Sequence, residues 1–170
     1  MALASFNPAR RRLLQRDRPL YRPPWALPEE RFVASCTRCD GCIDRCPEGI
    51  LVRGAGGFPE LDFGRGGCLF CGDCLQACEA GALASTDPVP ETAWSLRASI
   101  DERCLSAQGV VCRTCGDLCE TGAIRFRLQP GGRALPELDR GACTGCGACL
   151  AVCPAQAITL TSPREEISHE

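Results

Sequence analysis

The segment CTRCDGCIDRCP, residues 36–47, places four cysteines at the spacing C-x2-C-x2-C-x3-C and ends with a proline. The same spacing returns in CLFCGDCLQACE (68–79) and in CTGCGACLAVCP (143–154). A fourth segment, CLSAQGVVCRTCGDLCE (104–120), keeps the last two intervals but has seven residues in the first. All sixteen cysteines therefore fall into four sets of four. Set one is Cys36, Cys39, Cys42 and Cys46; set two is Cys68, Cys71, Cys74 and Cys78; set three is Cys104, Cys112, Cys115 and Cys119; set four is Cys143, Cys146, Cys149 and Cys153.

The repetition extends beyond the cysteines. Each set is followed by a turn and an apolar pair, in residues 47–52, 79–84, 120–126 and 154–160. Strand-like residues also precede sets two, three and four, at 58–63, 94–100 and 134–139. The repeating unit is thus strand, cysteine loop, short helical turn and strand. Because set three keeps its downstream strand and its last three cysteines, we interpret its long interval as an inserted loop and Cys104 as a ligand.

The spacing C-x2-C-x2-C-x3-C is the bacterial ferredoxin run that holds [4Fe–4S] clusters. Structural zinc favours separated C-x2-C pairs in a tetrahedral set, and three cysteines within seven residues suit it poorly. Disulfides would fit the count, but they belong to oxidising compartments. We therefore expect four [4Fe–4S] clusters, or three if the stretched third set is not occupied.

In this run the fourth cysteine ligates the other cluster of a pair, so two sets interlock. The sequence therefore predicts an α+β fold of two tandem bacterial 2[4Fe–4S] ferredoxin-like domains, at 31–88 and 89–164, with short strands and helices. An extended basic, Pro-rich arm (1–30) precedes them, a tail (165–170) follows, and the linker is about 85–92. The expected ligand groups are Cys36, Cys39, Cys42 with Cys78; Cys68, Cys71, Cys74 with Cys46; Cys104, Cys112, Cys115 with Cys153; and Cys143, Cys146, Cys149 with Cys119.

Composition favours a metal-organised, soluble protein. The chain has only six Phe, two Trp and one Tyr among 170 residues, so it has few large apolar side chains with which to fill a conventional core. A metal framework can replace part of that core. The run Arg10–Arg12 is followed by only two apolar residues, so it lacks the segment of about 7–15 that a secretory signal needs. No apolar run reaches the roughly 18 residues of a membrane span. We expect a cytoplasmic protein, where thiols stay reduced.

The charge is uneven along the chain. Residues 1–28 carry +5, from six Arg and one Asp, whereas the remainder carries −7 from thirteen Arg and twenty acids. The arm could fold back onto the acidic body or bind a partner, and that body would repel the phosphates of a nucleic acid. The candidate partner-binding residues are Arg10, Arg11, Arg12, Arg16, Arg18 and Arg22. With a single His and no Ser or Thr beside a plausible base, we expect electron movement or cluster handling and no catalytic residues.

Three features together resemble one family: the start RRRLLQRDRPLYRPPWA (10–26), the four sets, and the stretched third set followed by CETGAIRFR (119–127). They resemble the NapF-type ferredoxins of periplasmic nitrate reductase systems. The resemblance implies a cytoplasmic iron–sulfur accessory protein that contacts the catalytic molybdenum subunit before export and helps to mature it. The alternatives are a general electron-transfer ferredoxin and an electron-transfer subunit of a redox complex.

Overall fold

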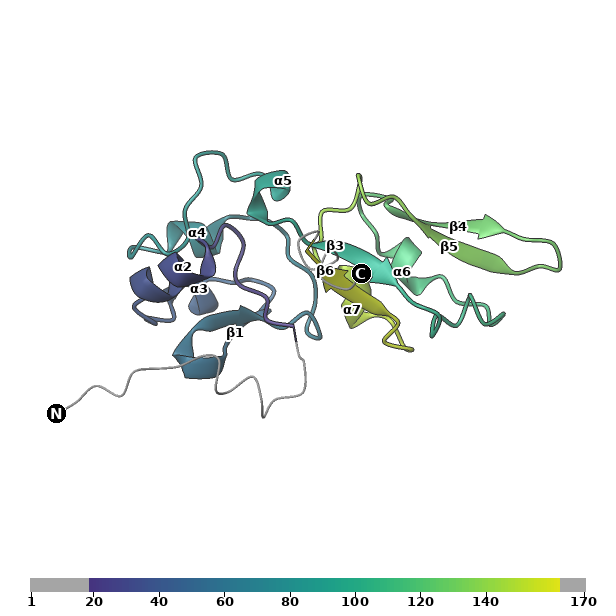
Figure 1. Ribbon diagram of the computed structural model, residues 1–170, viewed down its shortest axis with the longest axis horizontal. Helices are drawn as coiled ribbons and strands as arrows, with labels where there is room; N and C mark the ends of the chain where they lie inside the picture. Colours follow the sequence, from purple (N-terminus) through teal and green to yellow (C-terminus); the bar gives the residue numbers. More distant parts are fainter. Residues whose placement is uncertain (1–18, 163–170) are drawn as a thin grey trace.

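The computed structural model describes residues 19–162, which form two small α+β units joined by a linker (Figure 1). The first unit contains α2 (Glu29–Ser35), α3 (Gly41–Asp44), β1 (Leu51–Arg53), the 3₁₀ turn η1 (Ala55–Gly57), β2 (Pro59–Leu61) and α4 (Asp73–Gln76). The linker carries α5 (Pro90–Ala93). The second unit contains β3 (Arg97–Ile100), α6 (Thr114–Asp117), β4 (Ile124–Leu128), β5 (Ala134–Leu138), α7 (Ala148–Ala151) and β6 (Ile158–Thr161).

Each unit holds an equivalent antiparallel hairpin. β1 pairs with β2 through Leu51 and Leu61, and β4 pairs with β5 through Ile124 and Leu138. The first strand of each hairpin starts five residues after the last cysteine of a set, at Leu51 after Cys46 and at Ile124 after Cys119. The predicted strands after sets one and three, and before sets two and four, are therefore present. The hairpin lies at the same position relative to the cysteine sets in both units.

The strand predicted after set two, at 79–84, is absent. Leu83 forms only an isolated antiparallel bridge with Ala26, whereas β6 pairs with β3 over four residues, from Arg97–Thr161 to Ile100–Ile158. Leu83 lies five residues after Cys78, as Ile158 lies five after Cys153, so Ala26 occupies the place of Ile100. The amide of Trp25, which is the next donor on this side of the bridge, bonds the carbonyl of Ala93 instead (3.0 Å), so the pairing stops at a single bridge.

The predicted arm is therefore too long. Residues 21–27 belong to the first unit, because Pro23, Pro24 and Trp25 are buried in its core and Tyr21, Ala26 and Leu27 pack against that core; Trp25 is only 3 % exposed. The amide of Leu27 donates to the carbonyl of Ala82 (3.0 Å), and the amide of Ala84 donates to that of Trp25 (2.9 Å). Next comes α2, whose first two residues lie in the predicted extended arm and for whose remaining residues no helix was predicted; its Phe32 is fully buried.

The third cysteine of every set is the second residue of a four-residue helix: α3, α4, α6 or α7. Three of these helices are preceded by a residue in the left-handed region, namely Asp40 (φ 64°), Gly72 (φ 81°) and Gly147 (φ 83°). In set three this position is Arg113, whose φ is −135°. The inserted loop thus reaches α6 by a different backbone path from the other three sets.

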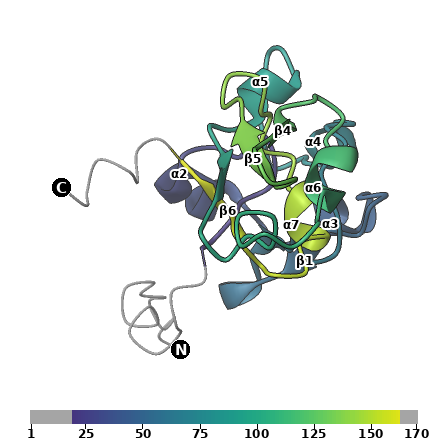
Figure 2. The same cartoon turned by 90° about the vertical axis from the view of Figure 1, so that its right-hand side faces the viewer.

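The two units share one hydrophobic core, which runs from Phe32 and Phe58 in the first unit to Ala98 and Leu160 in the second. Viewed end-on, the second unit lies in front of the first, with α6 and α7 adjacent (Figure 2). Within residues 19–162, no helix is long and apolar enough to cross a bilayer.

Candidate metal centres

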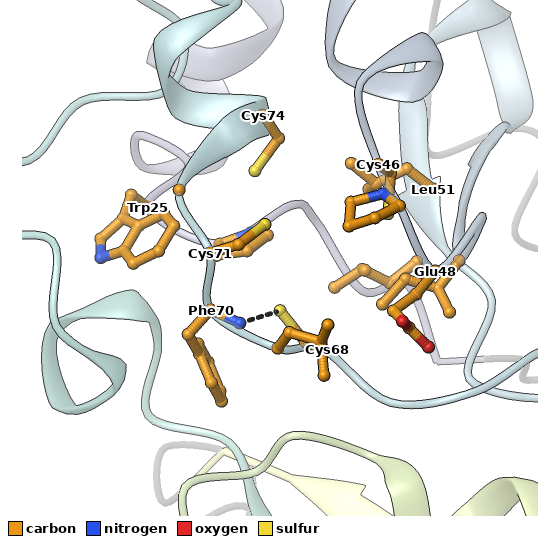
Figure 3. Close-up of a pocket in the computed structure, with 14 residues that line it drawn as sticks. Trp25, Cys46, Glu48, Leu51, Cys68, Phe70, Cys71 and Cys74 are labelled. Carbon is orange, nitrogen blue, oxygen red and sulfur yellow. Dashed lines mark hydrogen bonds between the residues drawn. The ribbon is translucent and has the colours of Figure 1, made fainter.

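A hollow in the first unit brings together Cys46, Cys68, Cys71 and Cys74. We call this group site two. Three of its thiols come from set two, and Cys46, the last cysteine of set one, faces them from the other side of the hollow (Figure 3). The remaining walls are mainly apolar, contributed by Pro24, Trp25, Ile50, Leu51, Leu61 and Phe70.

The second unit contains a matching hollow. It is lined by the thiol-bearing residues Cys104, Cys112, Cys115 and Cys153, which we call site three. Apolar walls come from Ile100, Leu105, Phe126 and Ile158. Cys104 therefore lies with the other cysteines of set three despite the inserted loop, and the last cysteine of set four completes the group.

The remaining eight cysteines form two more groups. Burial, followed by the negative charges of Cys36, Cys78 and Cys39, raises the pKa of Cys42 to about 11. We call these four residues site one. Burial, followed by the negative charges of Cys146, Cys143, Cys115 and Cys119, raises the pKa of Cys149 to about 12, and Cys115 itself lines the hollow of site three. Site four is accordingly Cys119, Cys143, Cys146 and Cys149. All four groups are those expected from interlocked sets, and iron ligation by each residue remains a prediction.

The thiols are suited to a ligand that displaces protons. Burial is the main cause of the raised pKa of Cys68 and Cys115, each about 11, and of Cys74, about 12. Without metal these thiols are protonated near neutral pH, so binding of a thiophilic metal group must release protons. The exposed Cys39 differs, because the backbone amide of Gly41 and then the Thr37 hydroxyl lower its pKa.

Each site also has a backbone amide directed at one of its sulfurs. Phe70 N donates to Cys68 Sγ at 3.4 Å in site two (Figure 3), and Leu83 N donates to Cys78 Sγ at 3.3 Å in site one. Ala157 N donates to Cys153 Sγ at 3.3 Å in site three, and Ala98 N donates to Cys143 Sγ at 3.5 Å in site four. Amides that bond the sulfurs stabilise their negative charge and tune cluster potential.

These features fit an iron–sulfur cubane. Each site offers four thiols that are not joined in disulfides, and sites two and three enclose them in largely apolar walls. In the described part of the chain, no three or more His, Cys, Asp or Glu side chains lie close enough to hold a single metal ion.

Comparison with known proteins also indicates iron–sulfur clusters. A family model described as the 4Fe-4S dicluster domain matches residues 35–82 and 108–157. The ferredoxin-type protein NapF of Escherichia coli (strain K12) is 46 % identical over 138 residues, which cover 81 % of this chain and 82 % of that protein. The NapF protein of Haemophilus influenzae is 45 % identical over 144 residues, covering 85 % of this chain and 80 % of the relative. The chain belongs to the NapF family of ferredoxin-type proteins.

NapF membership confirms the predicted fold of two tandem dicluster domains and the expectation of several [4Fe–4S] clusters. A more distant relative, the ferredoxin-type protein NapG of Escherichia coli (strain K12), is 31 % identical over 171 residues, covering 87 % of this chain and 74 % of that protein. The second dicluster match begins after Cys104. The place of this cysteine therefore rests on the structure, which puts it in site three.

The predicted partner-binding arginines of this NapF-family chain divide into two groups. Arg22 makes internal contacts: it donates to Glu29 at 2.9 and 2.6 Å, and its guanidinium lies 4.9 Å from the ring centre of Phe32. Its side chain is only 15 % exposed. The others, Arg10, Arg11, Arg12, Arg16 and Arg18, lie outside the described residues.

Proposed function

We propose that this protein is a cytoplasmic iron–sulfur accessory factor that binds the catalytic molybdenum subunit of periplasmic nitrate reductase before export and supplies it with electrons during maturation. The single observation that carries the proposal is the 46 % identity to a NapF protein over most of both chains. The four grouped thiol sites support the redox part, because [4Fe–4S] clusters accept and release single electrons.

Electron supply is favoured over donation of a cluster by how the sites are built. Every site takes its fourth thiol from another set, so releasing one cluster would disturb the helix that also serves its neighbour. Site two is further enclosed by the buried Trp25 and by Phe70. A cluster held in this way is suited to remain in place while electrons pass.

The second candidate is a general electron carrier that serves several reductases. The observation that favours it is the 31 % identity to NapG, which shows that this architecture also occurs in a different ferredoxin-type protein. The two candidates differ in partner selectivity rather than in cluster chemistry.

Capture of the catalytic subunit tests the proposed function. Full-length holoprotein, immobilised anaerobically, should retain the precursor of the molybdenum subunit more strongly than its mature form. An unrelated molybdenum reductase is the control. Equal retention of all three, or of none, would contradict the accessory role and favour the general carrier.

We further propose that the arginines before residue 19 contribute to this docking. A variant that carries Gln at Arg10, Arg11, Arg12, Arg16 and Arg18 should keep the iron content of the wild type but capture the precursor more weakly. Capture by the wild type should fall as salt rises. Arg22→Gln is unsuitable for this test because Arg22 contacts the core, and undiminished capture by the five-Gln variant would place docking on the ferredoxin units.

A further inference from the structure

The two ferredoxin units meet along a seam of aromatic side chains. Trp94, at the end of the linker, lies edge-on to Phe63 (ring centres 6.2 Å apart) and is tilted against Phe70 (5.3 Å). The Trp94 indole also donates to the carbonyl of Thr144 at 2.9 Å. Phe70 belongs to the loop of set two and Thr144 to the loop of set four, so Trp94 contacts both cysteine loops.

A backbone hydrogen bond crosses the same seam. The amide of Cys68 donates to the carbonyl of Cys146 at 2.8 Å. Cys68 belongs to site two and Cys146 to site four, so one hydrogen bond joins residues from two different thiol groups.

The seam depends on two glycines. A Cβ on Gly67 would lie 2.8 Å from Cβ of Ala148, the first residue of α7, and a Cβ on Gly147 would clash with the ring of Phe63. The loops can approach this closely only because these positions carry no side chain. The hydroxyl of Tyr21 adds a third link by donating to the carbonyl of Leu160 in β6 at 2.9 Å.

Within each unit, the two sites are neighbours because one short helix carries or adjoins cysteines of both. Cys42 and Cys46 lie on or beside the same short helix, α3, but belong to sites one and two. In the second unit, α6 carries Cys115 of site three and ends beside Cys119 of site four. The helices of each pair, α3 with α4 and α6 with α7, are in contact.

We propose that the seam holds sites two and four as direct neighbours, so that the four sites follow the order one, two, four, three along the molecule. Sites one and three are then the terminal sites. This order differs from the order of the cysteine sets in the sequence, because the second unit presents its last set to the first unit. The proposal deepens the redox part of the proposed function, since it requires occupied sites, but it does not depend on the identity of the partner.

Magnetic interaction between reduced clusters tests the order directly. One variant, Cys39→Ala with Cys112→Ala, removes sites one and three and leaves sites two and four. A matched variant, Cys39→Ala with Cys143→Ala, leaves sites two and three. In the fully reduced proteins, the first variant should show electron paramagnetic resonance signals broadened by a neighbouring spin, and the second should lose that broadening. Broadening only in the second variant would overturn the proposal.

Substitution at the seam gives a second test that keeps every cysteine. Gly67→Ala should preserve the iron content but weaken the magnetic interaction between the clusters of sites two and four. Protease should also cleave the linker faster in this variant. Gly64→Ala in the same loop is the control, because its Cβ would meet only a carboxylate oxygen of Asp62, at 3.2 Å. Unchanged spectra and cleavage in Gly67→Ala would show that the seam does not set the arrangement. Neither test uses the catalytic subunit. A negative result would therefore overturn the proposed order of the sites without bearing on the docking proposal.

Discussion

At the scale of the residue, the position of Cys104 decides how many sites the chain has. Seven residues separate it from Cys112, and the family match begins only at residue 108. The structure nevertheless places it with Cys112, Cys115 and Cys153 around one hollow. Because the rest of the pattern is intact, an insertion explains the long interval better than the loss of a site.

Replacing Cys104 with Ala should therefore remove one cluster. The iron content should fall from about sixteen to about twelve atoms per chain, since each [4Fe–4S] cluster holds four. Gln108→Ala, in the same inserted loop, is the matched control and should keep the full content. An unchanged iron content in Cys104→Ala would show that Cys104 is not a ligand.

A second residue, Glu48, lines the hollow of site two (Figure 3). A carboxylate near a cluster disfavours the reduced state, which carries one more negative charge. Glu48→Gln should raise the reduction potential of site two, as measured by an anaerobic titration followed by electron paramagnetic resonance. Glu91→Gln, on the linker helix α5, is the charge-matched control, and equal potentials in both variants would show that the Glu48 charge has no effect there.

At the scale of the element, the sequence predicts the cysteine loops, their short helices and most of the strands, because these follow from local spacing. It fails where the first unit recruits residues that precede its first cysteine. Nothing in the sequence around Pro23 and Trp25 indicates that Ala26 pairs with Leu83, since that contact joins positions 57 residues apart. The helix α2 was also missed, since its first two residues lay in the predicted extended arm and no helix was predicted for residues 31–35.

The buried face of α2 can be tested by substitution. Phe32 is fully buried and packs near Phe58 (ring centres 6.2 Å apart), so Phe32→Ala should cost about 3–5 kcal/mol. The visible absorbance of the clusters should then be lost at a lower temperature than in the wild type. Arg31→Ala, on the exposed side of the same helix, should change little. If both variants lost their absorbance at the wild-type temperature, α2 would not support the first unit.

At the scale of the whole molecule, the sequence predicted two domains but not how they meet. The seam depends on Trp94, Phe63 and two close glycine contacts, and these show no spacing that a repeat would reveal. The pairing of thiols within each unit was predictable, because the fourth cysteine of a ferredoxin run serves the partner cluster. The order of the four sites along the molecule was not, since it depends on contacts between side chains far apart in the sequence.

We expect all sixteen cysteines to hold four [4Fe–4S] clusters in one molecule. Iron and acid-labile sulfide, measured in full-length protein purified without oxygen, test it most directly. We predict about sixteen of each per chain, four per cluster. A reproducible value near twelve would contradict the claim, because one of the four thiol groups would then hold no cluster.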